Sequence, residues 1–357
     1  MSDKALLSFF VSDEETLAFW MDASSTGPEI EHLPVGQEEI KQAVKWLNRH
    51  FENINPVRPK YMPDMAFLAP LAQKFIQGLK RRLEGARSLV VSPHAELHGL
   101  PLQLLAGEDG LPLGITHSIT YCANLSLYGL LLGRQTEATL SGSRLPAACF
   151  STAAEGEDAR RHEIFAETPR KFAQLSGGVF KQGKEASRQA FLEYAGRSEI
   201  LYLSCHGMFD PSDPLYSTLF LSNGRSLPVA TLPASPDFGL DVYDILGLKV
   251  KAKLVILDAC LSGRQSFSTG DEPTGFPTAF LLAGASAVIA TNWSVYSASS
   301  GFFMTRLLDY WSSADRPTLG EALRLATRAT REEYPHPFHW AAFSLYGNDY
   351  LRFQHRQ

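Results

Sequence analysis

The sequence contains few cysteines and no excess of basic side chains. Its 357 residues include four cysteines, 33 basic residues and 38 acidic residues, which gives a formal charge of −5. The cysteines lack the paired spacing of a disulfide scaffold or a zinc ribbon, so we expect free thiols in a reducing, cytoplasmic compartment. A nucleic-acid-binding protein needs a concentrated basic face, which this charge balance does not suggest. We therefore expect no nucleic-acid partner.

Long apolar runs of membrane type are also missing. The N-terminal apolar stretch, residues 6–11, is short and acidic residues follow it at once, unlike a signal peptide. Residues 273–305 carry no charged side chain, but Pro277, Gly284 and Asn292 interrupt them. We interpret this segment as a buried helix followed by a buried strand of an α/β domain, and we expect no membrane contact.

Apolar strands alternate with helices over most of the chain. Strands are expected at residues 88–92, 115–121, 147–151, 200–205, 254–257 and 287–291. Helices are expected at residues 37–51, 68–83, 298–311 and 319–333, with another that begins near 159 and ends or kinks at Pro169. This alternation predicts an α/β/α sandwich with a mainly parallel sheet. The boundary between two parts of the chain, residues 1–142 and residues 143–357, is expected within residues 140–144.

Two of the expected strands end at reactive side chains. Residues 201–207 lead to His206 and then Gly207, and residues 254–263 lead to Cys260. In an open α/β sheet, functional groups gather at the carboxyl ends of the strands. The intervening chain is long enough for one crossover between neighbouring parallel strands. We therefore expect the imidazole and the thiol to emerge together at one sheet edge.

A thiol beside an imidazole can perform nucleophilic catalysis. A free thiol has a pKa of about 8.5, so an imidazole that accepts its proton makes it a better nucleophile. The same imidazole can then protonate a leaving amine. Glycine after His206 allows close approach of the backbone to a substrate, and the amides of Gly207 and Cys260 are candidates for an oxyanion hole.

Simpler interpretations exist for these residues. A cysteine at a strand end more often packs in the core, and we assign Cys122, Cys149 and Cys205 to packing. Adjacent strand residues point to opposite faces, so Cys205 and His206 are poor candidates to share a zinc ion with Cys260. We expect neither a metal nor a cofactor.

The ordered series of motifs resembles the CHAT domain, a caspase-like peptidase module found with tetratricopeptide repeats. The matching stretches are ELHGLP (96–101), LSCHG (203–207), LDACLSG (257–263), GFPTAFLLAGA (275–285), VIATNW (288–293) and HPFHWAAF (336–343). The resemblance covers nearly the whole chain. It implies a caspase-type fold in the clan that includes separases, metacaspases and gingipains, whose N-terminal half is a degenerate, non-catalytic relative of the second half.

The resemblance also implies roles for individual residues. His206 matches the catalytic histidine and Cys260 the nucleophile of a cysteine endopeptidase that acts on a protein substrate. Asp258 resembles the acidic residue with which metacaspases hold a basic P1 side chain, although an aspartate here can equally cap the next turn. Trp293 is a candidate wall of that pocket, with a core tryptophan as the alternative.

The resemblance further implies regulation and leaves two other functions open. Tetratricopeptide repeats do not precede the module in this sequence, so we expect a separate regulatory or activating protein, or else a regulatory part of a longer chain to which this sequence belongs. A role in bacterial defence or cell death is implied by the family alone. The alternatives are a catalytically silent caspase-like interaction scaffold and a sensor in which Cys260 is reversibly oxidised.

Overall fold

The structure is a computed structural model. It describes residues 3–52, 54, 62–107, 109–138, 147–152, 154–155, 159–222, 227–228, 239–267 and 270–353. The boundary expected at residues 140–144, between 1–142 and 143–357, lies outside the described residues.

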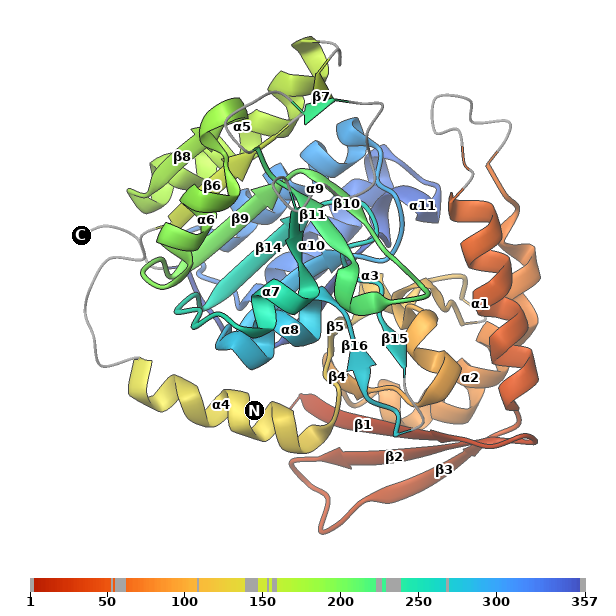
Figure 1. Cartoon of the computed structure of the whole chain (residues 1–357). Helices are drawn as coiled ribbons and strands as arrows, with labels where there is room; N and C mark the ends of the chain where they lie inside the picture. Colours follow the sequence, from red (N-terminus) through yellow and green to blue (C-terminus); the bar gives the residue numbers. More distant parts are fainter. Residues whose placement is uncertain are drawn as a thin grey trace.

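Within the described part of the chain, eleven strands form one sheet (Figure 1). In spatial order they are β3 (Glu29–Leu33), β2 (Thr16–Asp22), β1 (Lys4–Val11), β4 (Ser88–Ser92), β5 (Ser118–Tyr121), β18 (Phe343–Gly347), β17 (Ala287–Thr291), β14 (Leu254–Asp258), β9 (Ile200–Ser204), β6 (Ala147–Ser151) and β8 (Val179–Gln182). Neighbours are parallel except at β3–β2, β2–β1 and β18–β17. The predicted, mainly parallel sheet is confirmed.

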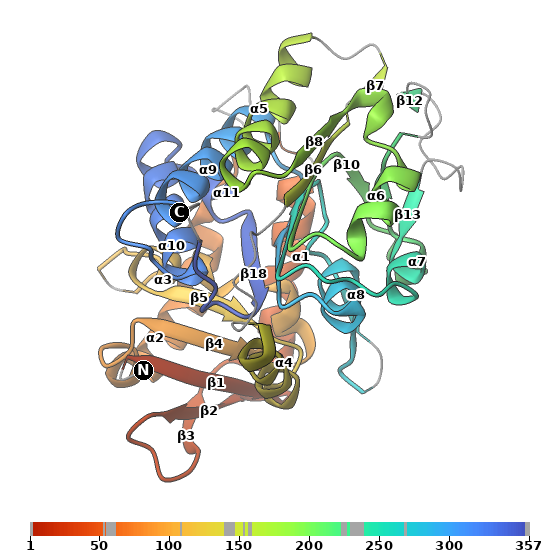
Figure 2. The same cartoon turned by 90° about the vertical axis from the view of Figure 1, so that its left-hand side faces the viewer.

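Helices cover both faces of this sheet. One face carries α1 (Gln37–Glu52), α2 (Ala69–Leu83), α5 (Ala159–Ser176), α9 (Ser297–Trp311), α10 (Leu319–Glu333) and the short α11 (Pro337–Trp340). The other carries α4 (Leu125–Ala138), α6 (Arg188–Ala195), α7 (Val242–Leu246) and α8 (Phe276–Ala283). Figure 2 shows α9 and α10 on one side of the sheet and α6, α7 and α8 on the other. The fold is therefore an α/β/α sandwich, as predicted.

Alternate residues of the central strands supply the two cores. In β9, Ile200 and Tyr202 join the core under α5 and α9, whereas Leu201 and Leu203 join the core under α6, α7 and α8. All four are essentially inaccessible to solvent. A strand that is apolar on both faces is typical of a parallel sheet covered by helices, which explains the unbroken apolar runs in the sequence.

The last strand joins the N-terminal strands to the others. β18 pairs in parallel with β5, with Leu345 opposite Thr120, and antiparallel with β17. Just after β18, Asp349 forms a buried ion pair with Lys4 of β1 at 2.5 Å. Residues from both ends of the chain therefore help to hold one continuous sheet.

Some element predictions are wrong in detail. The strand expected at 115–121 begins only at Ser118, because Leu113–Thr116 (α3) form a helical turn in which the N–H of His117 donates to the carbonyl of Leu113 (2.8 Å). Of the two outcomes expected at Pro169, an end or a kink of the helix, the end is wrong, because α5 continues to Ser176. Ala166 and Phe172, on either side of the proline, are both fully buried, so packing on the sheet favours continuation.

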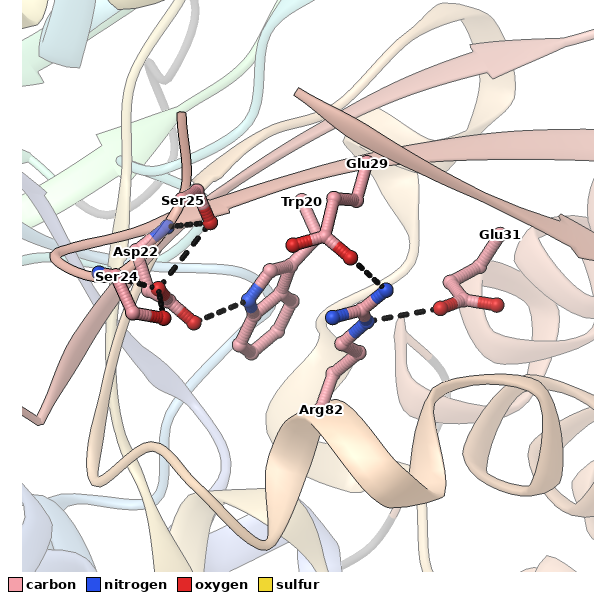
Figure 3. Close-up of polar contacts among 7 residues, drawn as sticks. All are labelled: Trp20, Asp22, Ser24, Ser25, Glu29, Glu31 and Arg82. Carbon is pink, nitrogen blue, oxygen red and sulfur yellow. Dashed lines mark hydrogen bonds and ion pairs between the residues drawn. The ribbon is translucent and has the colours of Figure 1, made fainter. Parts of the chain in front are cut away.

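The outermost strand β3 is attached to α2 by ionic contacts (Figure 3). Arg82, in the last turn of α2, donates through Nε to Glu31 at 2.8 Å and pairs with Glu29. At the end of β2, hydrogen bonds from the Ser24 hydroxyl and from the Trp20 indole hold the pKa of Asp22 well below its usual range. Charged side chains on an edge strand also discourage pairing with a further strand.

Candidate active site

His206 and Cys260 follow two neighbouring parallel strands. Strands β9 and β14 pair with Ser204 opposite Asp258, and the N–H of Cys205 donates to the carbonyl of Asp258 (3.3 Å). His206 and Cys260 each come two positions after this last pair. Because side chains alternate along a strand, an even offset from Ser204 and Asp258 predicts that both lie on the face of the sheet that α5 and α9 cover.

Contacts of the two side chains agree with this placement. The His206 ring lies 6.4 Å from that of Phe165 on α5, measured between centroids. The Cys260 thiol interacts with Ser294 and with the backbone N–H of Val295, which lie between β17 and α9. Cys205 is buried in the opposite core, so it points away from both of them.

The backbone of Gly207 lies directly against Cys260. A Cβ atom added to Gly207 would lie 2.5 Å from the carbonyl oxygen of Cys260 and 3.3 Å from the Cβ of Ala259. Only a residue without a side chain allows two segments to approach so closely. The residue after His206 and the candidate nucleophile are therefore immediate neighbours.

A second, small sheet holds the backbone at His206. His206 begins β10 (His206–Met208), which pairs antiparallel with β11 (Thr218–Phe220), and β11 pairs in turn with β13 (Gly239–Asp241). In the first pair His206 is opposite Phe220. The imidazole therefore projects from a segment that is hydrogen-bonded beyond the end of the main sheet.

Cys260 lies in a tight turn that is fastened to β17. The next residue, Leu261, has a φ of 60°, an unfavourable conformation for a bulky side chain that persists only when the surroundings impose it. The N–H of Leu261 donates to the carbonyl of Trp293 (3.3 Å), and the N–H of Gly263 donates to that of Thr291 (2.8 Å). The Thr291 hydroxyl also donates to the carbonyl of Ala259. These bonds impose the turn.

The thiol of Cys260 is half-buried, whereas the other three cysteines are buried. Burial raises the pKa of the Cys260 thiol, and the negative charge of Asp258 acts in the same direction. Hydrogen bonds from Val295 and Ser294 oppose this shift in part. The protonated thiol is therefore favoured at rest, and a base is needed to form the thiolate.

Asp258 and Trp293 lie in the interior beside the turn. Asp258 is only 5% exposed; Ser300 of α9 donates to its Oδ1, and the Tyr202 hydroxyl lies 3.5 Å from its Oδ2. Burial raises the pKa of this carboxyl group to about 6. The Trp293 indole donates to the carbonyl of Phe338 (2.9 Å) and packs edge-on against Phe51.

A pocket opens between the nucleophile turn and the N-terminal elements. Its lining includes Phe209, which follows His206 by three positions, Trp293 and the segment Gly263–Gln265. The N-terminal part contributes three residues of α1 (Val44, Leu47 and Asn48) and four of the 3-10 helix η3, Ala95–Gly99 (Ala95, Glu96, His98 and Gly99). No pattern in the sequence predicts that α1 lies at this pocket. The ELHGLP motif, which contains Glu96 and His98, was the available signal.

Neither a metal cluster nor a membrane helix is found in the residues that the structure covers. No group of three or more histidine, cysteine, aspartate or glutamate side chains there is arranged to hold a metal ion. Likewise, none of the helices in those ranges combines the length and the apolar character needed to cross a bilayer.

Comparison with solved structures identifies the class of fold. The chain is similar to separase of Saccharomyces cerevisiae in its complex with securin (TM-score 0.61, 11% identity, 97% of this chain and 30% of that chain). It is also similar to the Arg-specific cysteine proteinase gingipain R of Porphyromonas gingivalis (TM-score 0.53, 12% identity, 89% and 76%). The caspase-like fold is therefore confirmed.

The family follows from the sequence match. The model of the CHAT domain family matches residues 65–348, and the chain belongs to this family. Tetratricopeptide repeat protein 28 of Homo sapiens is 31% identical over 133 residues, and its Mus musculus counterpart is 30% identical over 126 residues. These matches span about a third of this chain (36% and 34%) but only 5% of the length of those relatives.

Proposed function

We propose that this chain is a cysteine endopeptidase in which Cys260 is the nucleophile and His206 the general base. One observation carries the proposal: the close approach of Gly207 to Cys260 where β9 and β14 end. Membership of the CHAT domain family and the fold shared with a cysteine proteinase support it.

The proposed reaction has two steps. His206 accepts the thiol proton as the sulfur of Cys260 attacks the peptide carbonyl, and the backbone amides of Gly207 and Cys260 stabilise the oxyanion. The C–N bond then breaks, the imidazolium protonates the leaving amine and a thioester remains. In the second step His206 takes a proton from water, which attacks the thioester and releases the acid and the thiol. No cofactor takes part in this scheme.

The substrate in this proposal is a protein chain. The pocket beside the nucleophile turn is the candidate site for one of its side chains, with Trp293 as part of the wall. The family resemblance also makes Asp258 a candidate to hold a basic P1 side chain. The hydrogen bonds of Asp258 to Ser300 and Tyr202 favour a structural role, different from the turn cap considered from the sequence, in which the carboxyl group connects the end of β14 to α9.

Control by a partner is part of the proposal. The solved separase is in complex with a second protein, securin, which is a precedent for a protein partner bound to this fold. We propose that a separate protein restrains or activates this chain in the cytoplasm. A role in bacterial defence or cell death rests on the family resemblance.

A silent interaction scaffold is the second candidate function. The observation that favours it is the raised pKa of the Cys260 thiol, because a half-buried, protonated thiol is a weak nucleophile. An enzyme overcomes this through His206 once a substrate or an activator is bound. A scaffold would never do so, and a redox sensor would react with peroxide whether or not His206 is present.

Labelling with a peptidyl acyloxymethyl ketone, with the candidate activator present and absent, separates these functions. We expect the wild-type chain to be labelled at Cys260, Cys260→Ala to be unlabelled, and His206→Ala to react about 10²-fold more slowly. A peptide library analysed by mass spectrometry then gives the P1 preference. Absence of labelling under all conditions would rule out the peptidase function. Equal labelling rates in wild type and His206→Ala would indicate a sensor.

A further inference from the structure

The segment after Cys260 is attached to the N-terminal elements through Arg264. This side chain lies four positions after the candidate nucleophile and is only 18% exposed. Its Nη1 pairs with Glu52 at 2.5 Å, and its Nη2 donates to the side chain of Asn48 at 2.7 Å. Both partners lie near the C-terminal end of α1, where the helix dipole also favours a cation.

A second attachment lies further along the same loop, at Asp271. The N–H of Ala95 donates to Asp271 Oδ1 (2.8 Å), and His98 Nε2 lies 3.2 Å from Oδ2. The ring of Phe267 stacks on that of His98, with centroids 3.8 Å apart. Ala95 and His98 belong to η3, so the loop after Cys260 is held by the N-terminal part of the chain at two places.

The turn between Cys260 and Arg264 has little freedom to absorb movement. The N–H of Arg264 donates to the carbonyl of Leu261 (3.0 Å), and Gly263 is bonded to β17. A displaced Arg264 would therefore pull on Leu261, the residue already held at positive φ, and on the adjacent nucleophile. Errors of about 1 Å in the placement of a reacting group can cost about 10²-fold in rate.

We infer that Arg264 is a positioning residue through which helix α1 fixes the nucleophile turn. The inference rests on the proposed cysteine peptidase function and adds a role for the N-terminal part of the chain. A partner that moves α1 would change the reactivity of Cys260 without touching either His206 or Cys260. Arg264 itself contacts neither of the proposed reacting groups in the hydrogen bonds and ion pairs described above.

A charge swap tests this inference. We expect Arg264→Glu to lower kcat about 10²-fold, with a separate change in KM because Arg264 also lines the pocket beside the nucleophile turn. The double variant Arg264→Glu/Glu52→Arg should recover at least about ten-fold of the loss in kcat. Arg264→Lys keeps the charge but cannot bridge Glu52 and Asn48 at once, so an intermediate loss of about ten-fold is expected. The Arg264→Lys variant also tests the inference if Arg264→Glu does not fold.

Matched controls separate positioning from general stability. Lys74 of α2 forms an ion pair at 2.8 Å with Glu39 of α1, the helix that Arg264 also contacts, and this pair is more exposed to solvent. We expect Lys74→Glu to leave kcat unchanged. Melting temperatures of all variants are measured in parallel. If Arg264→Glu retains wild-type kcat, or if the double variant folds with a wild-type melting temperature but stays as slow as Arg264→Glu, the inference is wrong.

A readout that needs no peptide keeps the two proposals distinguishable. Alkylation of Cys260 by iodoacetamide, followed by mass spectrometry as a function of pH, reports the environment of the thiol in the intact chain. We expect Arg264→Glu to change both the rate and the pH profile, and the double variant to restore them. If no peptide is cleaved, the proposed function fails while this measurement still decides the role of Arg264: identical profiles in wild type and Arg264→Glu would overturn it.

Discussion

A methyl group on Gly207 would lie 2.5 Å from the carbonyl oxygen of Cys260. The strand that ends at His206 and the turn that contains Cys260 are thus in contact through their backbones, with no side chain between them. This contact places an imidazole and a thiol at the carboxyl ends of adjacent parallel strands, β9 and β14. The proposed cooperation of the two side chains depends on this close contact between Gly207 and Cys260.

Gly207→Ala should therefore damage the site. Because real Cβ atoms do not approach backbone oxygens to 2.5 Å, one of the two segments must move, and we expect kcat/KM to fall about 10²-fold. Gly129→Ala in α4 is the control, since a Cβ there meets nothing within 4 Å and alanine favours a helix. Peptide cleavage and thermal unfolding check both variants; a fully active Gly207→Ala would contradict the proposed site.

Thr291 offers a test of the support beneath the nucleophile turn. Its buried hydroxyl donates to the carbonyl of Ala259 and lies 3.3 Å from the hydroxyl of Ser262. Thr291→Val keeps the shape but removes these hydrogen bonds, so we expect a loss of about 1–2 kcal/mol in the free energy of unfolding and a lower kcat. Thr291→Ser, which keeps the hydroxyl, should retain more of the activity. Urea unfolding and steady-state kinetics measure the two effects, and equal kcat values in the two variants would argue against the role of the hydroxyl.

Asp258 predicts a dependence of stability on pH. Burial raises the pKa of its carboxyl group to about 6 in the folded chain, above the value of the unfolded chain. The folded state therefore binds the proton more tightly, and the stability that Asp258 contributes at pH 4 is lost as the pH rises through 6. Replacement by asparagine removes this titration. Between pH 4 and pH 8 the free energy of unfolding of Asp258→Asn should rise by about 2 kcal/mol relative to wild type.

Urea unfolding of both proteins at several pH values measures that difference. Parallel curves for wild type and Asp258→Asn would show that the carboxyl group does not titrate in this range. The same variant distinguishes the roles proposed for Asp258. If Asp258 lies in the S1 pocket, the Asp258→Asn variant should lose the preference of the enzyme for basic P1 residues. If the carboxyl group only connects β14 to α9, the variant should keep that preference.

The resting thiol should react slowly at neutral pH. Burial raises the pKa of Cys260, so its alkylation rate should keep rising, about ten-fold per pH unit, beyond the point near 8.5 at which a free thiol begins to level off. Rates of iodoacetamide modification at Cys260, compared with glutathione, measure this, and Cys260→Ser identifies the signal. A plateau that begins at acidic pH would instead indicate a preformed thiolate–imidazolium pair.

The sequence predicts the strands that carry the candidate site because their signals are local. Residues 200–205 and 254–257 are apolar on both faces, which is what a helix-covered parallel strand requires, and each leads directly to His206 or Cys260. The strand at Phe343–Gly347 and the helix at Leu125–Ala138 were not predicted. Strand β18 is five residues long and depends on pairing with β5, more than 200 positions earlier, which no local pattern reveals.

By itself, the sequence determined the α/β/α class and the order in which a histidine and a cysteine end two buried strands, because both follow from hydrophobic periodicity and the geometry of parallel sheets. Only the tertiary structure decided which side of the sheet they share, how closely Gly207 approaches Cys260, and that α1 and η3 hold the loop after the nucleophile. Such contacts join residues far apart in the chain, as the ion pair between Glu52 and Arg264 does. Long-range packing of this kind leaves no periodic trace in the sequence.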